Sequence, residues 1–163
     1  EKYILIIKKK TANLFAASCQ TGAIASGSSR EMEVALKKYG LNFGIAFQIM
    51  DDCMDLIGRK RDLGKNPGTD LSMGEETLPV LNLLAQSSPK ERKLLVGLLR
   101  SSYSKEALKE VRARFLASPS YIKTQRDIAG YIINAKRCLN KLEESSFKNS
   151  LSGLADFILS KIS

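Results

Sequence analysis

Residues 40–57 read GLNFGIAFQIMDDCMDLI, and this stretch decides the fold class of the chain. Its apolar side chains recur at helical spacing, without the alternation that is typical of a strand. On a helix with about 100° between neighbouring residues, Gln48, Asp51, Asp52 and Asp55 fall within one sector of about 100°. The sequence therefore predicts a strongly apolar helix whose polar face carries a cluster of carboxylates.

Helical spacing also dominates the rest of the chain, and the four prolines fall where helices would start or stop. We predict helices over residues 2–27, 31–58, 75–87, 89–101, 104–117, 120–146 and 148–162. Pro89 suits the first position of a helix, and Ser104 suits an N-cap. The predicted fold class is all-α.

Composition and charge exclude several classes of protein. The 163 residues are 44% hydrophobic, and no apolar run approaches the roughly 20 residues of a transmembrane segment. Histidine is absent, and Cys19, Cys53 and Cys138 form no CxxC pair, so neither a zinc site nor histidine-dependent catalysis is expected. The net charge of +9 is spread along the chain with few aromatic residues beside it, so no nucleic acid is expected as a partner. Unpaired cysteines favour a reducing compartment, and we expect a cytoplasmic protein, or one in an organelle with a reducing interior.

The carboxylate face costs free energy unless something compensates for it. Asp51 and Asp55 form a like-charged i,i+4 pair, which destabilises a helix by roughly 0.2–0.5 kcal/mol. Mg²⁺ would remove this cost, because it binds carboxylate oxygens while keeping water and phosphate oxygens as further ligands. Gly40 and Gly44, on or beside this face, leave room for a ligand or for another helix. The alternative is a solvent-facing acidic patch on a half-buried helix.

One lysine of the run Lys8-Lys9-Lys10 differs from the others when the first helix is projected in the same way. Lys10 falls within an apolar stripe, whereas Lys8 and Lys9 point to the other side. The stripe consists of Tyr3, Ile7, Leu14, Ala17 and Thr21. An inward ammonium would need an anionic partner such as a diphosphate. The alternative is a side chain that covers apolar surface while its charged end reaches water.

The segment 58–74, GRKRDLGKNPGTDLSMG, interrupts the helical pattern directly after the carboxylates. Its basic residues, Lys65 among them, and its glycines suit a loop that approaches a polyphosphate. It contains neither a P-loop motif nor a dinucleotide-binding fingerprint. A mobile surface loop is the alternative.

Several motifs follow one another in the same order as in the second half of trans-isoprenyl (polyprenyl) diphosphate synthases, which this chain resembles. They are Lys10-Thr11-Ala12, Tyr39-Gly40, Gly44-x-Ala46-Phe47-Gln48, Asp51-Asp52-x-x-Asp55, Gly64-Lys65, Gly68-x-Asp70-Leu71 and Thr77-Leu78-Pro79. The resemblance covers about residues 3–85 well, and the later helices match in pattern only. It implies an isoprenoid-synthase-type helical bundle around a central cavity, as a homodimer, with two aspartate-rich motifs that hold Mg²⁺ ions and an allylic diphosphate between them.

The resemblance also assigns roles to individual residues. Asp51, Asp52 and Asp55 correspond to the second aspartate-rich motif and are expected to bind metal, with Asp51 foremost as a direct ligand. Lys10 and Lys65 are expected to bind the substrate diphosphate. Thr11 and Gln48 are expected to stabilise the allylic cation that forms as diphosphate departs.

The implied reaction is a Mg²⁺-dependent condensation of an allylic diphosphate with isopentenyl diphosphate, which gives a longer isoprenyl diphosphate. Asp51-Asp52 is the only Asp-Asp pair in the sequence, so the first motif of the family is missing. We therefore expect residues 1–163 to be the C-terminal part of a single synthase domain whose N-terminal half is absent. This chain alone should be inactive and should require that half or a partner subunit.

Two other interpretations stay open. Glu75 stands where the family usually has a lysine, and it would repel a diphosphate, so the chain could be a non-catalytic or degenerate subunit that modulates a partner synthase. It could also be an unrelated all-α interaction domain whose acidic helix binds a partner. A second aspartate-rich motif in a longer chain would favour the enzyme over both.

Overall fold

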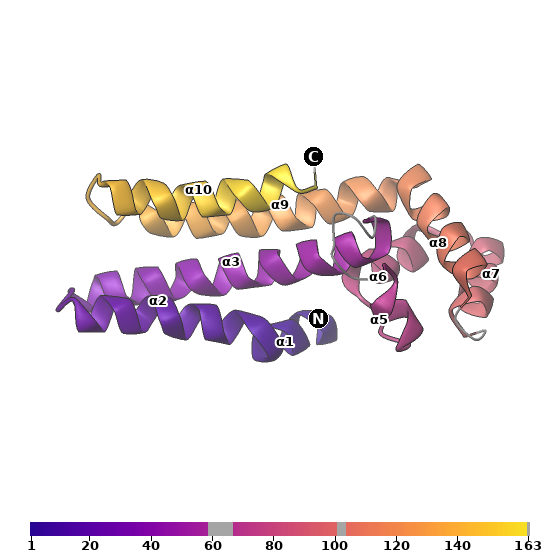
Figure 1. Ribbon diagram of the computed structural model, residues 1–163, viewed down its shortest axis with the longest axis horizontal. Coiled ribbons are helices and arrows are strands. Elements are labelled where there is room, and N and C mark those ends of the chain that lie inside the picture. The colour runs from indigo at the N-terminus through magenta and orange to yellow at the C-terminus, as the bar shows by residue number, and fades with distance from the viewer. Residues whose placement is uncertain (59–66, 101–103, 163) are drawn as a thin grey trace. The chain divides into compact units, whose positions relative to one another are not determined.

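The computed structural model describes residues 1–58, 67–100 and 104–162. Over these residues the chain folds into helices joined by turns, without a strand, which confirms the all-α prediction. The elements are α1 (Lys2–Ile7), the π-helical turn η1 (Lys8–Ala12), α2 (Asn13–Ala25), α3 (Arg30–Ile57), α5 (Thr69–Ser72), α6 (Leu78–Gln86), α7 (Pro89–Arg100), α8 (Lys105–Ala117), α9 (Pro119–Leu139) and α10 (Ser146–Ser160) (Figure 1). Among the helices of these three ranges, none has the length and apolar composition needed to cross a membrane.

The helices divide into two compact units. The first comprises Glu1–Met50 with Asp127–Ser163, and the second comprises Asp51–Arg126. The helix α3 therefore contributes its long first part to one unit and its last two turns to the other.

Two predicted helix starts are confirmed, a third lies three residues from its predicted place, and one predicted helix end is wrong. α7 begins at Pro89, and the Ser104 side chain caps α8 by accepting a hydrogen bond of 3.0 Å from a backbone N–H. α6 begins at Leu78 rather than 75, because the backbone of Thr77 is still extended. α9 ends at Leu139 rather than 146, and the residues between it and α10 form turns.

A π-helical turn in the first predicted helix shifts its buried face. Such a turn adds one residue to the helical repeat, so later positions rotate relative to a regular α-helix. The buried positions accordingly run from Ile7 to Ala12 and Ala16. Leu14, which the regular projection places in the apolar stripe, is 73% exposed, and the stripe members after it are exposed too. The prediction that the apolar stripe continues through Leu14, Ala17 and Thr21 is therefore wrong.

Gly40 and Gly44 allow α3 to pack closely against η1 and α2. A Cβ on Gly44 would lie 2.7 Å from Ala12 Cα, and a Cβ on Gly40 would collide with the backbone of Phe15. Real Cβ atoms do not make contacts this short, so a side chain at either position would push the helices apart. The space cleared by these glycines is thus filled by a neighbouring helix rather than by a ligand.

Aromatic rings extend this contact. The Phe15 ring lies 5.3 Å from the Phe43 ring, edge to face, and 5.5 Å from the Phe47 ring. Tyr39 stacks on Phe43 with 5.9 Å between ring centroids. These are distances at which aromatic pairs stabilise a core.

The remaining helices of the first unit pack on α3 and on each other, and Figure 1 shows them running lengthwise beside it. The hydroxyl of Tyr39 on α3 donates a hydrogen bond of 2.7 Å to the backbone oxygen of Leu151 on α10. Lys136 on α9 pairs with Asp156 on α10 at 2.8 Å. On α9, the side chain of Ile132 is fully buried.

The second unit has a hydrophobic core of its own. This core packs the last turns of α3 together with α6, α7 and α8. Its buried members are Cys53, Leu56, Val80, Leu83, Leu84, Leu95, Val111 and Phe115. A buried hydrogen bond of 3.0 Å from Asn82 to Thr124 adds a polar contact between α6 and α9.

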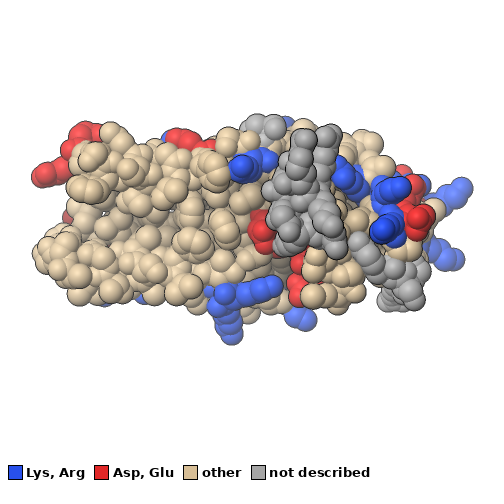
Figure 2. Space-filling model, in the orientation of Figure 1, with Lys and Arg blue, Asp and Glu red and all other residues tan. Residues whose placement is uncertain are grey.

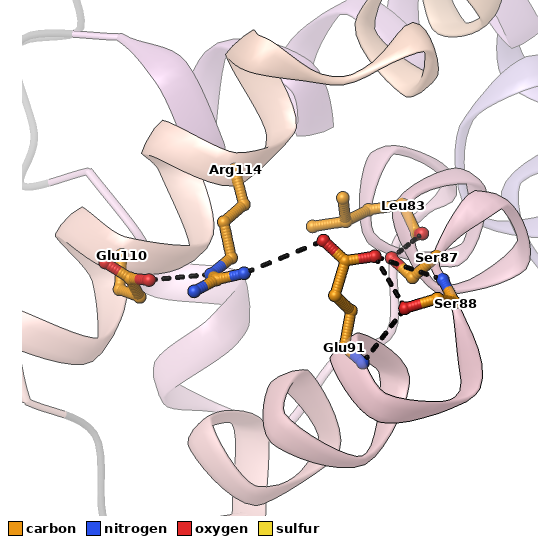
Figure 3. Close-up of polar contacts among 6 residues, drawn as sticks. All are labelled: Leu83, Ser87, Ser88, Glu91, Glu110 and Arg114. Carbon is orange, nitrogen blue, oxygen red and sulfur yellow. Dashed lines mark hydrogen bonds and ion pairs between the residues drawn. The ribbon is translucent and has the colours of Figure 1, made fainter.

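A capping box starts α7 (Figure 3). The backbone N–H of Ser88 donates to the Glu91 carboxylate at 3.1 Å, and the Glu91 N–H donates to the Ser88 hydroxyl at 3.3 Å. This reciprocal pair satisfies two N–H groups that a helix start leaves without an intrahelical partner. Arg114 on α8 lies 3.9 Å from Glu91 and 2.6 Å from Glu110, but these exposed ion pairs contribute little.

The glycine contact predicts a contrast between two Gly→Ala substitutions. G44A should lower the free energy of unfolding by about 1–3 kcal/mol, because the added methyl overpacks the α2–α3 contact. The matched control is G22A in the exposed part of α2, where an added Cβ meets nothing within 4 Å. G22A should raise stability by about 0.5–1 kcal/mol through helix propensity alone. Urea unfolding of both variants measures this, and equal effects of the same sign would contradict the proposed packing role of Gly44.

Candidate functional site

Thr11 and Gln48 form a direct contact in the first unit. The Thr11 hydroxyl donates a hydrogen bond of 2.6 Å to Gln48 Oε1, across 37 positions of sequence. Thr11 lies on η1 next to Ala12, and Gln48 lies one turn after Gly44 on α3, so the close contact of Ala12 with Gly44 brings the two side chains together. Two residues that the sequence paired by resemblance are therefore neighbours.

The geometry of this pair has a chemical consequence. The single proton of the Thr11 hydroxyl points to Gln48, so the lone pairs of that oxygen point elsewhere. The Gln48 side chain is only 9% exposed, which holds the amide in a defined position. The pair thus presents fixed oxygen dipoles in a largely buried environment, where such dipoles interact strongly with a nearby charge.

The π-helical turn carries both Thr11 and Lys10. Lys10 is exposed, as is Lys9, while Lys8 is half-buried. Exposure thus does not set Lys10 apart from Lys9, and it fits the alternative interpretation of a side chain whose charged end reaches water. π turns occur frequently at functional sites, and this one was not visible in the sequence.

The carboxylates of the second unit differ in their surroundings. Asp51 is half-buried, whereas Asp52 is 5% exposed and Asp55 is 2% exposed. Oδ2 of Asp55 accepts a hydrogen bond of 3.0 Å from the backbone N–H of Asp70. The backbone oxygen of Asp55 accepts another, of 2.8 Å, from the N–H of Gly68.

As hard oxygen donors, these side chains suit Mg²⁺ or Ca²⁺ rather than a soft metal. Burial of a carboxylate costs free energy that a cation or hydrogen bonds must offset, which fits a cation at Asp51 and Asp52. However, no three His, Cys, Asp or Glu side chains in ranges 1–58, 67–100 and 104–162 are grouped so that they could hold a metal ion by themselves. A cation bound here would need further ligands, such as phosphate oxygens and water.

Cys53, between the aspartates, does not contribute chemistry at neutral pH. Its side chain is fully buried, and burial, with the nearby charge of Asp52, raises the pKa of the thiol to about 12. Burial and the raised pKa keep this thiol protonated at pH 7, which disfavours it as a nucleophile. It belongs to the hydrophobic core of the second unit.

The basic loop is only partly described. Lys65 lies outside the described residues, so its predicted contact with a diphosphate stays a prediction. Glu75 is exposed, and together with Glu76 and Arg92 it lines a cavity of about 690 Å³ within the second unit. The rest of the lining is mostly apolar and consists of Leu71, Gly74, Leu81, Leu84, Ala85, Val96 and Leu99.

Two features of the site escaped the sequence interpretation. One is the π turn, for which the sequence offers no signal. The other is the contact of Asp55 with Gly68 and Asp70, for which a signal did exist, because Gly68-x-Asp70 was among the recognised motifs. The spacing of these residues could not show which atoms meet.

The model of the polyprenyl synthetase family matches residues 1–115. A short chain isoprenyl diphosphate synthase of Methanothermobacter thermautotrophicus is 38% identical over 99% of this chain and 49% of its own length. The octaprenyl diphosphate synthase of Escherichia coli is 32% identical over 95% of this chain and 48% of its own length. The chain thus spans about half the length of the curated relatives it matches.

Solved structures agree with these relatives. A polyprenyl synthase from Caulobacter crescentus, complexed with calcium and isoprenyl diphosphate, superposes with a TM-score of 0.90 and 35% identity, over 99% of this chain and 49% of that one. A decaprenyl diphosphate synthase from Rhodobacter capsulatus gives a TM-score of 0.87 at 30% identity, covering 99% of this chain and 50% of that one. The predicted all-α polyprenyl synthase fold is confirmed. The narrower prediction of a C-terminal half is not borne out, since the family model matches residues 1–115.

The contact between Thr11 and Gln48 predicts a measurable coupling. In a double-mutant cycle of T11V and Q48L, the two substitutions should deviate from additivity by about 0.5–1.5 kcal/mol in the free energy of unfolding. The control cycle pairs Q48L with T21V, an exposed threonine on α2. That pair should be additive, and a T11V/Q48L cycle that is equally additive would show that the hydrogen bond contributes nothing.

Proposed function

Because the chain belongs to the polyprenyl synthetase family, we propose that it works in a prenyltransferase of isoprenoid biosynthesis. The proposed reaction joins an allylic diphosphate to isopentenyl diphosphate and yields a longer isoprenyl diphosphate. One observation carries the proposal: the family match over residues 1–115 includes Thr11, Gln48 and the carboxylates of α3. Thr11 and Gln48 are joined by a hydrogen bond, Asp55 accepts one from Asp70, and Asp52 is buried.

The reaction as proposed breaks one bond and forms another. The C–O bond of the allylic diphosphate breaks, its electron pair leaves with the diphosphate, and an allylic cation remains. The double bond of isopentenyl diphosphate attacks this cation, and loss of a proton restores a double bond in the product. The departing diphosphate is the base that we propose for that proton.

Thr11 and Gln48 suit the stabilisation of the cation. Their oxygens are negative ends of dipoles, held in place by the 2.6 Å hydrogen bond between them. Dipoles that are already oriented cost no reorganisation when positive charge develops, which is why they lower a barrier effectively. Lys10, which is exposed, and Lys65 are proposed to bind the diphosphate.

Asp51 and Asp52 are the carboxylates that we propose for Mg²⁺. When bound, a divalent cation neutralises charge on the leaving diphosphate. Calcium and isoprenyl diphosphate in the Caulobacter crescentus structure support a hard divalent cation in this family. Asp55 belongs to the same motif, but its own contacts indicate a different role.

Further polypeptide is part of the proposal, either the rest of a longer chain or a partner subunit, with a homodimer as the assembled form. Several large apolar side chains of the first unit are exposed, among them Leu14 at 73% and Phe147 at 81%. Figure 2 shows few charged side chains over α2, α3, α9 and α10 on the face that it draws. Exposed apolar surface of this kind is typical of protein interfaces.

A reducing compartment, such as the cytoplasm, is proposed for the protein. All three cysteines, Cys19, Cys53 and Cys138, are free thiols. Free thiols persist where glutathione and thioredoxin keep them reduced.

A non-catalytic subunit is the second candidate function. Glu75 favours it, because this exposed carboxylate stands near Glu76 at a position where the resemblance implies a diphosphate-binding lysine. An unrelated interaction domain, the third interpretation, has no support now that the family is known.

Kinetics of the assembled protein test the metal assignment. D51N should lower kcat/KM by about 10²–10³-fold, as expected for the loss of one group that stabilises transition-state charge. The control is D156N, which removes an exposed carboxylate that pairs with Lys136 at the surface of the first unit. D156N should leave kcat/KM unchanged. A D51N rate within about threefold of the wild type would contradict the metal assignment.

The isolated 163-residue chain should form no product from labelled isopentenyl diphosphate and an allylic primer. The physical reason is that one carboxylate cluster alone leaves most ligands of a cation to water, so that charge on the diphosphate is poorly neutralised. Product analysis with a known synthase as positive control makes the measurement. Turnover by this chain alone would show that a second aspartate-rich cluster is not needed.

A further inference from the structure

Asp55 is bound twice by one short segment of the chain. The N–H of Gly68 donates to the backbone oxygen of Asp55 at 2.8 Å, and the N–H of Asp70 donates to its Oδ2 at 3.0 Å. Both donors lie in the segment Gly68–Glu75, which contains α5. A carboxylate that accepts a backbone N–H forms a charge-assisted hydrogen bond, which is stronger than a neutral one.

The segment that binds Asp55 has a backbone shaped for this contact. Gly68 has φ +80° and Gly74 has φ +74°, a conformation that residues with a side chain rarely adopt. The N–H of Glu75 donates to the backbone oxygen of Asp70 at 2.9 Å, which closes the segment on itself. One glycine therefore starts a tight turn beside Asp55, and the other helps to end it.

Burial separates Asp55 from Asp51, and its hydrogen bond from Asp70 is the contact that sets it apart from Asp52, which is 5% exposed. Only 2% of Asp55 is exposed, whereas Asp51 is half-buried. Oδ2 of Asp55 already accepts the Asp70 N–H, so this oxygen is less available to a cation that also keeps water and phosphate oxygens.

We propose that Asp55 is a positioning residue that holds the segment Gly68–Glu75 against the last turns of α3, and that it is not a metal ligand. The cation is then left to Asp51 and Asp52, a division that rests on the proposed function. The positioning role does not rest on it, because both hydrogen bonds join atoms of this chain alone. The hydrogen bonds from Gly68 and Asp70 to Asp55 hold the start of this segment at the last turns of α3.

The role of Asp55 can be tested with three variants of the full protein, D55A, D55N and D51N. Hydrogen exchange of the Asp70 amide, followed by NMR, should be about tenfold or more faster in D55A, because its acceptor is lost. D55N should restore most of the protection, since a carboxamide oxygen still accepts a hydrogen bond. D51N should leave this amide unchanged.

Binding of Mn²⁺, a hard divalent probe, separates positioning from ligation. D55N should bind Mn²⁺ within about threefold of the wild type, while D51N should bind it at least about tenfold more weakly, because a charged ligand is lost. A loss in D55N equal to that in D51N would overturn the proposal. So would an Asp70 amide that exchanges equally slowly in D55A and the wild type.

Two further outcomes are informative. If D55A fails to fold, G68A replaces it, since a Cβ at φ +80° strains the turn while every carboxylate is kept. G68A should speed exchange of the Asp70 amide without changing Mn²⁺ affinity, and an unchanged amide would contradict the proposal. If the wild type binds no Mn²⁺, the metal part of the proposed function fails, while the exchange data still decide the role of Asp55.

Discussion

The close approach of α3 to η1 and α2, over Gly40 and Gly44, is the contact on which the first unit depends. It lets backbone atoms meet where side chains would otherwise separate the helices. One turn beyond this contact, Gln48 receives the hydrogen bond of Thr11. A polar pair of this kind is useful only if its oxygens stay in place, and backbone packing on both sides of a helix–helix contact supplies that rigidity.

A second constraint acts at the other end of α3. Asp52 and Asp55 are carboxylates with almost no exposed surface, and such groups persist only when cations or hydrogen bonds compensate for lost hydration. The return of Gly68 and Asp70 to Asp55 supplies part of this compensation through backbone N–H groups. In the division that we propose, Asp55 meets a structural requirement of this motif, and Asp51 and Asp52 supply its cation chemistry.

Much of the fold followed from local rules. The helical class, the start of α7 at Pro89 and the cap of α8 at Ser104 depend on propensities and capping that act over a few residues. Boundaries such as the start of α6 depend on longer-range packing and were misplaced by a few residues. The capping box of Ser88 and Glu91 has a local sequence pattern, S-x-x-E, that could have predicted it. The start of α7 was predicted from Pro89 alone.

By itself, the sequence determined that the chain is helical and that Asp51, Asp52 and Asp55 share one face, because helical periodicity and residue spacing are properties of a single element. It also determined the family, since several motifs occur in order. Only the tertiary structure decided that a helix fills the space beside Gly44 and that Asp55 accepts hydrogen bonds from Gly68 and Asp70. These outcomes depend on contacts between residues far apart in the chain, and such contacts leave no periodic signal in the sequence.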